Sequence, residues 1–228
     1  MLRLDLLFFM LGAVLASPEM AETIGLESGG WYLSRGEDRE ARLSLSSDDA
    51  EGKRRSNWTT DLQWTELEGL EPSALDRADA PIIFRLRRDA GTFVCQGRAL
   101  AHGRAAGDWR LELNPDYGPA LVRRGYGRPN PSQQVEMAWA NVALAFVDEL
   151  TRQGYPKSTI DGLIRAAHHG VNVTYTREMG ELGLKRERLE DLVQMRDHGV
   201  SPRYVRALAA HGSRASMPRL SFACAITA

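Results

Sequence analysis

Three histidines, His168, His169 and His198, are the side chains of this sequence best suited to metal binding or proton transfer. His169 and His198 are 29 residues apart, and each stands directly before a glycine. A shared zinc ion would need ligand bonds of about 2 Å, whereas packed helices lie about 8–10 Å apart. A histidine in the last turn of a helix is instead stabilised by the helix dipole. The pattern therefore favours helix ends, and we expect no metal and no cofactor.

Motifs that position catalytic groups do not occur in the sequence. It contains no His-Glu-x-x-His, Gly-x-Ser-x-Gly, Walker-type glycine loop or Cys-x-x-Cys. The polar run from Ser46 to Arg55 holds three acidic residues, but they lack the order of a calcium loop, so a solvated turn is expected. We therefore expect no catalytic residue and a protein that is not an enzyme.

The sequence allows two interpretations of its tryptophans and two of its cysteines. The four tryptophans of the first half belong either to a core or to a carbohydrate platform, and large aromatic residues in a small sheet favour the core. They are Trp31, Trp58, Trp64 and Trp109. Cys95 alternates with Phe93 on the expected inner side of a strand, which favours a buried free thiol over a disulfide with Cys224.

In the second half, a pattern that recurs every 29 residues must position the histidines. Each copy has an aromatic residue, an aliphatic residue four positions later and a glycine four positions after that. The four copies begin at Tyr117, Phe146, Tyr175 and Tyr204. Three residues before them stand Asn114, Ala143, Asn172 and Ser201, of which all but Ala143 are good helix N-caps. The spacing predicts helices that begin at this column.

Second helices are expected between these copies, at residues 131–140, 159–169 and 188–198. They end at Asn141, Gly170 and Gly199, which suit the left-handed conformation at a helix C-terminus. One helix pair alone cannot cover its apolar side, so neighbouring pairs must stack. The period therefore predicts a short α-helical solenoid of four repeats of about 29 residues, the last one truncated.

The first half, from about residue 31 to 113, alternates apolar and polar residues with the period of a β-strand. Ile82, Phe84 and Leu86, for example, alternate with Ile83, Arg85 and Arg87. Residues 81–88 and 92–96 are expected to form a hairpin in which Gly91 takes a positive φ. The predicted fold is α+β: a signal peptide at residues 1–20, an antiparallel β sandwich or roll at 24–114 and a helical repeat domain at 115–228.

Composition and the N-terminus indicate where the protein works. The chain has 43% hydrophobic and 26% charged residues and a net charge of -1, so nucleic acid is not an expected partner. Arg3, the apolar run of residues 6–15 and the small residues Ala16 and Ser17 fit a secretory signal, with an N-terminal core segment as the alternative. The run is too short for a stable membrane span. A periplasmic or secreted protein is expected.

The turn at Gly199 has the length of a DNA-binding helix-turn-helix, with arginines on its second helix. The equivalent positions hold Thr174 and Arg177 in one repeat and Ala145 and Asp148 in another, so no basic stripe is expected along the repeats. These positions form a possible interaction surface for a protein partner. It comprises Asp148, Arg177, Arg203 and Arg206.

The run of residues 192–208 resembles the repeats of a poorly characterised group of bacterial exported proteins. In some relatives the repeats follow a membrane-bound zinc metallopeptidase domain of the beta-lactam-sensing-regulator type, and in others a β-rich piece. The resemblance covers mainly residues 114–212, and the β-rich part is similar more loosely. The zinc motif of the peptidase is absent, so its activity is not implied. The last copy also departs from the pattern, with Ser213 where Tyr126, Tyr155 and Leu184 follow the earlier glycines.

We therefore hypothesise a non-catalytic, exported protein-interaction module that binds a protein partner through a helical repeat surface. The alternative is a ligand-sensing or accessory component of a bacterial envelope peptidase or stress-response system. The sequence leaves a small-molecule ligand open.

Overall fold

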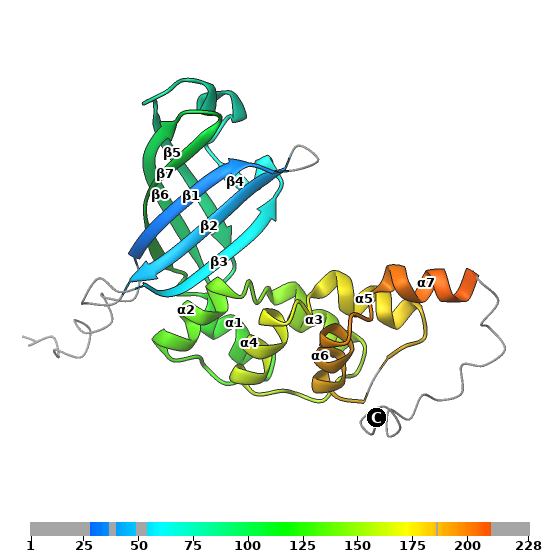
Figure 1. Ribbon diagram of the computed structural model, residues 1–228. Helices are drawn as coiled ribbons and strands as arrows, with labels where there is room; N and C mark the ends of the chain where they lie inside the picture. The colour runs from blue at the N-terminus through cyan, green and yellow to red at the C-terminus, as the bar shows by residue number, and fades with distance from the viewer. Residues whose placement is uncertain (1–27, 37–39, 49–53, 186, 211–228) are drawn as a thin grey trace, which may run out of the picture.

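The structure is a computed structural model that describes residues 28–36, 40–48, 54–185 and 187–210 (Figure 1). The strands are β1 (Ser28–Arg35), β2 (Ala41–Asp48), β3 (Arg54–Leu62), β4 (Leu67–Glu68), β5 (Pro81–Arg88), β6 (Gly91–Leu100) and β7 (Arg104–Leu113). The helices are α1 (Tyr117–Arg123), α2 (Pro131–Trp139), α3 (Leu144–Arg152), α4 (Ile160–His168), α5 (Val173–Glu181), α6 (Leu189–Asp197) and α7 (Pro202–Ala210). Two 3-10 helices, η4 (Trp64–Glu66) and η5 (Pro72–Asp76), precede β4 and β5. A β part therefore precedes a helical part.

All seven strands belong to one antiparallel sheet with the order β3-β2-β1-β7-β6-β5-β4. β1 pairs with both β2 and β7, so strands from the two ends of the β part lie side by side. Along β5, Ile82, Phe84 and Leu86 are buried and the residues between them are exposed. The alternation predicted for this strand is confirmed, and its apolar side faces the core.

The sheet curls until its apolar side meets itself, with β1, β2 and β3 crossing in front of β5, β6 and β7 in Figure 1. Trp31 on β1 and Phe84 on β5 make an edge-to-face contact with ring centroids 5.1 Å apart. β7 and β6 lie between these strands in the sheet. A flat sheet would hold the two rings about 14 Å apart, which is three strand spacings. The curl therefore covers the apolar side without a second layer.

Two facing glycines permit this curvature. Gly97 of β6 lies opposite Gly107 of β7. A Cβ atom at Gly107 would lie 2.0 Å from the carbonyl oxygen of Gln96, so no side chain fits there. The indole Nε1 of Trp31 donates to the carbonyl oxygens of Gln96 at 3.2 Å and of Asp108 at 3.0 Å. Because neither glycine has a side chain, β6 and β7 can bend at this pair, where the Trp31 indole donates its hydrogen bonds.

The expected β sandwich or roll is wrong, because the strands form one curled half-barrel sheet and not two packed sheets. The period of two shows that a strand has a buried side, but it does not show which surface covers that side. Gly91 also differs from its prediction, because its φ is not positive. A Cβ atom there would lie 2.8 Å from the carbonyl oxygen of Glu112, so close contact with β7 explains this glycine.

Trp139 of α2 covers the end of the half-barrel that faces the helices. Its ring lies edge-to-face on Phe93 at 5.6 Å and on Trp109 at 5.2 Å between centroids. Leu75 of η5 is buried in the same core, and Asp76 beside it binds Arg35 at the far end of β1 with an N–O distance of 2.7 Å. One core cluster thus runs through the sheet, η5 and the helices.

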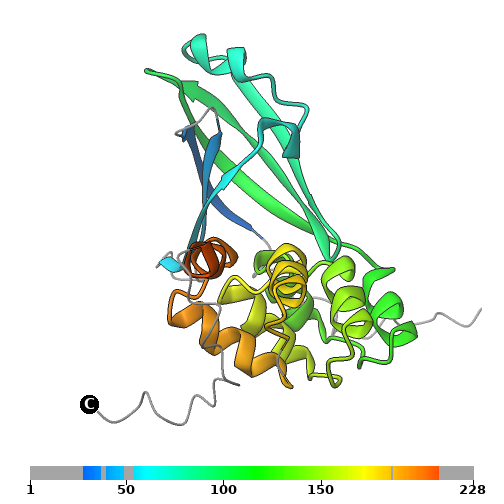
Figure 2. The same cartoon turned by 90° about the vertical axis from the view of Figure 1, so that its right-hand side faces the viewer.

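The expected short solenoid is wrong as well. The helices have only seven to nine residues, and they do not form a separate stack of like pairs, since α2 packs on β6 and β7 (Figure 2). The four aromatic residues that head the pattern are not equivalent: Tyr117, Phe146 and Tyr175 are buried, whereas Tyr204 is 52% exposed. The period indicates where helices begin and end. The nearest uncovered apolar surface, here the end of the sheet, decides what they pack on.

Helix ends follow the local sequence signals except at α1, whose N-cap residue is Asp116 and not the predicted Asn114. Asn141, Gly170 and Gly199 have φ values of 54°, 76° and 72°, which confirms the left-handed conformation predicted after α2, α4 and α6. The side chain of Asn172 accepts a hydrogen bond from the backbone N–H of Tyr175 at 2.9 Å, as an N-cap does.

The turn between β5 and β6 supplies the cap that α3 lacks. Ala143, the N-cap residue of α3, has no side-chain acceptor, and the carboxylate of Asp89 accepts from the N–H of Leu144 at 2.6 Å. Gln134 of α2 donates to the carbonyl oxygens of Ala90 at 2.9 Å and of Asn114 at 2.6 Å. These hydrogen bonds therefore fix α2 and α3 to the sheet near the contact of Trp139 with Phe93 and Trp109.

The role of Gly97 and Gly107 in the curvature of the sheet can be tested by adding one methyl group, with the substitution Gly107→Ala. We expect Gly107→Ala to lower the free energy of unfolding by about 1–3 kcal/mol, because the added Cβ overlaps the backbone of β6. Gly127→Ala is the matched control, since nothing lies within 4 Å of a Cβ there, and it should change stability by less than about 0.5 kcal/mol. Urea denaturation measures both. Equal stability of the two variants would contradict the role of the glycine pair.

Candidate functional site

The three histidines lie at helix ends, as the sequence predicts. His169 is the C-cap residue of α4, and His198 is that of α6. His169 Nδ1 lies 2.5 Å from Asp197 Oδ1, and His168 Nε2 lies 3.4 Å from Glu136 Oε2, so both rings pair with carboxylates of neighbouring helices. Within the described ranges, no three His, Cys, Asp or Glu side chains gather where they could hold a metal ion.

The four tryptophans of the first half and Cys95, for which the sequence left alternatives, all lie in the β part of the structure. Trp31 and Trp109 are buried, and Trp58 and Trp64 are partly buried against the same core, so these rings are core residues. Cys95 is a free, fully buried thiol whose pKa is raised by burial. Cys224 lies outside the described residues.

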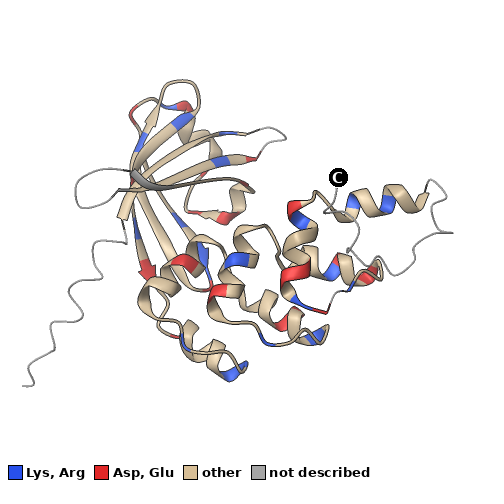
Figure 3. Ribbon diagram, turned by 60° about the horizontal axis from the view of Figure 1, so that its bottom comes forward, with Lys and Arg blue, Asp and Glu red and all other residues tan. Residues whose placement is uncertain are grey.

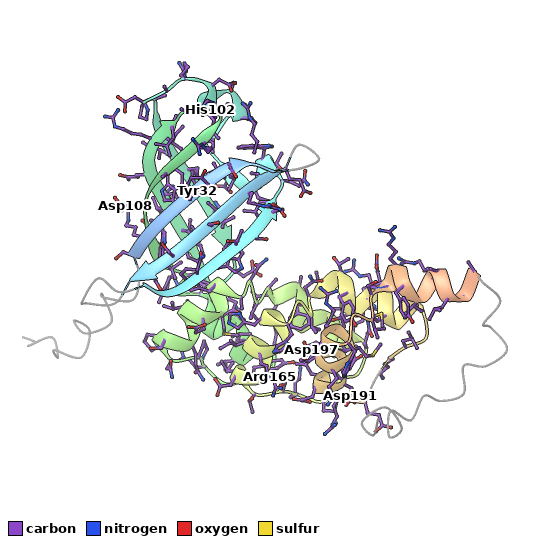
Figure 4. The ribbon with its side chains drawn as sticks, viewed as in Figure 1. Tyr32, His102, Asp108, Arg165, Asp191 and Asp197 are labelled. Atoms are coloured by element: carbon purple, nitrogen blue, oxygen red, sulfur yellow. The ribbon has the colours of Figure 1, made fainter. Side chains whose placement is uncertain are left out.

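A groove of about 670 Å³ lies between α2 and α4. Its floor is formed by Val135 and Ile164, and its rim carries Glu136, Asp161 and Arg165. Figure 4 shows Arg165 on the side of the helices that faces away from the sheet. Because the rim carries charges of both signs, the groove does not favour one ligand chemistry.

A second hollow, of about 530 Å³, lies at the turn between β5 and β6. It is lined by polar groups such as Arg87, Glu112 and Asn114. Asn114 Nδ2 donates to the carbonyl oxygen of Asp89 at 2.9 Å, and the Asp89 carboxylate caps α3. Asp89 and Asn114 thus connect the sheet to the helices, while Arg87 pairs with Glu68 and Glu112 with Arg110 within the sheet, which explains their arrangement without a ligand.

Three of the four predicted interaction residues bind neighbouring helices of the same chain. On α3, Asp148 accepts two hydrogen bonds from Arg124, at 2.7 and 2.9 Å, and these bonds lower the pKa of Asp148. Arg177 of α5 lies 3.8 Å from the carboxylate of Glu149 on α3. These two residues therefore connect helices, although both are exposed.

On α7, the two other predicted residues differ from each other. Arg206 Nη1 lies 3.5 Å from Glu178 Oε2 of α5, and the Arg206 side chain is 52% exposed. Arg203 is exposed and has no ion pair with any residue that the structure describes. The four residues thus lie along α3, α5 and α7, and the unpaired charge is at the α7 end.

Glu149 is the centre of a polar cluster that connects α3 with α5. Its carboxylate is 5% exposed and accepts from Arg152 at 2.5 and 2.9 Å and from Gln153 at 2.6 Å. Gln153 also donates to the carbonyl oxygen of Thr176 on α5 at 2.9 Å. The hydrogen bond from Arg152, followed by that from Gln153, lowers the pKa of Glu149 against the opposing effect of burial. The cluster is structural, because its carboxylate is occupied by partners of the same chain.

On its outer side, α7 carries an apolar stripe formed by Tyr204, Ala207 and Leu208, here called the α7 stripe. Tyr204 is 52% and Leu208 36% exposed, and the two lie four residues apart on one side of the helix. The opposite side, with Pro202 and Val205, is buried, and α7 packs on α5. At 100° per residue, Arg203 lies beside Ala207 at one edge of the stripe, whereas Arg206 lies about 160° from Tyr204 and Leu208, on the side where it meets Glu178 of α5.

The tyrosines of α1 and α5 show how the other helices cover such a position. Tyr117 Oη donates to the carbonyl oxygen of Val142 at 2.7 Å, and Tyr175 Oη donates to that of Val200 at 3.0 Å. Both rings are buried, and burial raises the pKa of Tyr117. The Tyr204 hydroxyl makes no corresponding bond within the described part of the chain. Of the equivalent tyrosines of α1, α5 and α7, Tyr204 is therefore the one that remains exposed.

The departure of the last copy from the repeat pattern is the sequence signal for this difference. Tyr126 and Tyr155, which follow the glycines of the first two copies, are buried, but the fourth copy has the polar residue Ser213 at this place. The loss of this apolar residue indicates that the fourth copy is covered differently from the others.

Comparison of the chain with protein-family models, with curated proteins and with solved structures gives no match. The helices of the described residues are all too short and too polar to cross a bilayer. The surface of α7 must therefore be interpreted from its own geometry.

The Glu149 cluster predicts a pH-dependent stability. We expect Glu149→Gln to lower the free energy of unfolding at pH 7 by about 1–3 kcal/mol, because charge-assisted hydrogen bonds are lost. The folded-state pKa of Glu149 lies below the unfolded value of about 4.3. Its ionised form thus stabilises the fold above that pH, and this contribution disappears as the pH falls through the folded-state pKa.

Urea denaturation at neutral and at acidic pH should therefore show the deficit of Glu149→Gln shrinking in acid. Asp116→Asn is the control, because Asp116 is exposed and its side chain does not bond the N-terminus of α1. A deficit that stays constant over pH would mean that the carboxylate charge is unimportant.

The exposure of Tyr204 predicts that it contributes little to stability. We expect Tyr204→Ser to change the free energy of unfolding by less than about 0.5 kcal/mol. Tyr175→Ser, the same change at the buried position of α5, should cost about 3–5 kcal/mol, because it removes a packed ring and its hydrogen bond. Thermal or urea denaturation compares the two, and similar losses would show that Tyr204 is a core residue.

Proposed function

We propose that this chain is a non-catalytic, exported protein that binds another protein through the α7 stripe. The observation that carries the proposal is the exposure of Tyr204 and Leu208, which occupy positions that are buried in α1, α3 and α5. Full burial of an exposed leucine side chain contributes about 1.5–3 kcal/mol, and a partner that covers the 36% of Leu208 that is exposed gains a part of this energy. Tyrosine and arginine are the residue types that most often dominate protein interfaces.

A non-catalytic role is supported by the pairing of the groups that could do chemistry. His168 and His169 pair with carboxylates at the surface, Cys95 is buried with a raised pKa, and Glu149 is occupied by Arg152 and Gln153. The interior of the curled sheet is filled by side chains such as Trp31 and Phe84, which gives no support to a small-molecule site there.

Export is part of the proposal and rests on the signal-like residues 1–20, which lie outside the described residues. Expression of the full chain with a C-terminal tag, followed by cell fractionation, tests it. Recovery of a shortened chain in the periplasm or the medium is expected. Recovery of the uncut chain in the cytoplasm would contradict export while leaving the binding proposal to its own test.

Binding is tested with the full chain immobilised and exposed to a bacterial envelope extract. We expect one protein to be retained in a saturable manner, and the double variant Tyr204→Ser, Leu208→Ser to retain at least about tenfold less, which is about 1.4 kcal/mol. Ile83→Ser is the matched control, because Ile83 is a 60% exposed apolar residue on the outer side of the sheet. No saturable retention, or an equal loss with Ile83→Ser, would overturn the proposal.

A further inference from the structure

We infer that residues 220–227 of this chain add to the free edge of β3 as an eighth, antiparallel strand. These residues lie outside the described part of the chain, so the inference rests on the edge that would receive them and on their sequence. The surface concerned is the curled sheet and not the α7 stripe.

β3 is an edge strand with one unused side. It pairs with β2 from Arg54 to Leu62, and no other strand of the described residues pairs with it. The backbone hydrogen bonds found in the described turns and loops do not involve residues 54–62. In an antiparallel edge strand, every second residue directs its N–H and C=O away from the neighbouring strand. These groups of β3 can therefore bind a further strand.

The other edge of the sheet is better protected. There β4 pairs with Leu86 and Arg85 of β5, and Leu70 and Leu75, which follow β4 in the chain, are buried in the core. A very short edge strand with covering loops is a common protection of a sheet edge. Within the described ranges, no strand or turn binds the outer side of β3 in this way, so this longer edge stays open.

The inner side of β3 is also incompletely covered. Leu45 of β2 is fully buried, whereas Trp58 of β3, which lies opposite Leu45, is only half-buried. Trp64, two residues after β3, is half-buried as well. Apolar side chains on an added strand would lie beside Trp58 and remove part of its ring from water.

Residues 220–227 have the alternation that such a strand requires. Leu220, Phe222, Cys224 and Ile226 are apolar, and the residues between them are serine, alanine, alanine and threonine. The segment contains no proline, glycine or charged residue, types that are depleted in strands. Placed beside β3, the larger side chains face Trp58 and the small ones face outward.

The connection to α7 fits this placement. α7 ends at Ala210, and nine residues, 211–219, lead from it to the segment. Fully extended they span about 30 Å, which is also the length of a nine-residue strand such as β3. An antiparallel strand would begin at the C-terminal end of β3, and in Figure 1 β3 runs toward the side of the molecule on which α7 lies.

Other occupants have less in their favour. Asp61 is the one charged residue between Asn57 and Leu62, and Arg42 binds it at 2.8 and 3.0 Å, so the edge has no free charge that would select a partner. Basic and acidic residues are interspersed over the sheet and the helices (Figure 3). A strand of another molecule offers the same backbone groups, but a segment linked to the edge has an effective concentration on the order of mM.

Amide hydrogen exchange, measured by mass spectrometry, tests the inference. We expect residues 56–62 to exchange at least about tenfold more slowly in the full chain than in a chain that ends at Met217, because the added strand binds the outward N–H groups of β3. Exchange in β6, which is paired on both sides, reports whether the sheet is intact and should be the same in both forms.

Two substitutions in the full chain separate strand pairing from other effects of the segment. Phe222→Lys places a charge on the inner side of the added strand and should abolish the protection of residues 56–62. Ala223→Lys is the matched control, because it places the same charge one residue further on, on the outer side, and should keep the protection.

Three outcomes would overturn the inference. The first is equal exchange of β3 in the full and the shortened chain, and the second is an equal effect of Phe222→Lys and Ala223→Lys. The third is protection of β3 that rises with protein concentration, since the strand would then come from a second copy. Slower exchange in α7 with no change in β3 would place the segment on Tyr204 and Leu208, which overturns the inference and also removes the surface of the proposed function.

Discussion

The edge-to-face contact of Trp139 with Phe93 and Trp109 is the interaction on which the rest of the structure depends. A sheet with one apolar side must cover it, and this sheet does so by curling at Gly97 and Gly107. A curled sheet still has open ends, and the end beside the helices is filled by one large ring from α2. Without this ring the core of the sheet would open to water, and α2 would lose the surface that orients all later helices.

From this anchor the helices extend by contacts between next-but-one neighbours: α2 with α4, α4 with α6, α3 with α5 and α5 with α7. Asp89 starts α3 at a defined place, and the Arg124–Asp148 pair and the Glu149 cluster hold α1, α3 and α5 together. Each contact covers the apolar side of the helix before it. α7 is the last helix of the described residues, and it packs on α5 but leaves Tyr204 exposed.

Local features of this chain were predictable from the sequence, whereas most long-range ones were not. Alternation predicted the buried side of β5, and Asn141, Gly170 and Gly199 predicted three helix ends, because these signals act within one element. The single curled sheet depends on backbone contact between Gly97 and Gly107, whose pairing no local pattern contains. The same holds for the candidate site. The positions of Arg203 and Arg206 in the 29-residue repeat made them candidates, whereas the exposure of Tyr204 depends on which residues pack beside α7.

The α7 stripe is also held ready for binding. A helix of nine residues is not stable alone in water, because its nucleation cost exceeds what so few hydrogen bonds return. α7 is kept helical by burial of Pro202 and Val205 and by Ser201, whose hydroxyl accepts from the N–H of Tyr204 at 3.1 Å. Tyr204 and Leu208 therefore lie on one side of an already formed helix before a partner binds. The loss of conformational entropy on binding then comes mainly from the partner. This preformed geometry, more than the small apolar area, makes a selective contact possible.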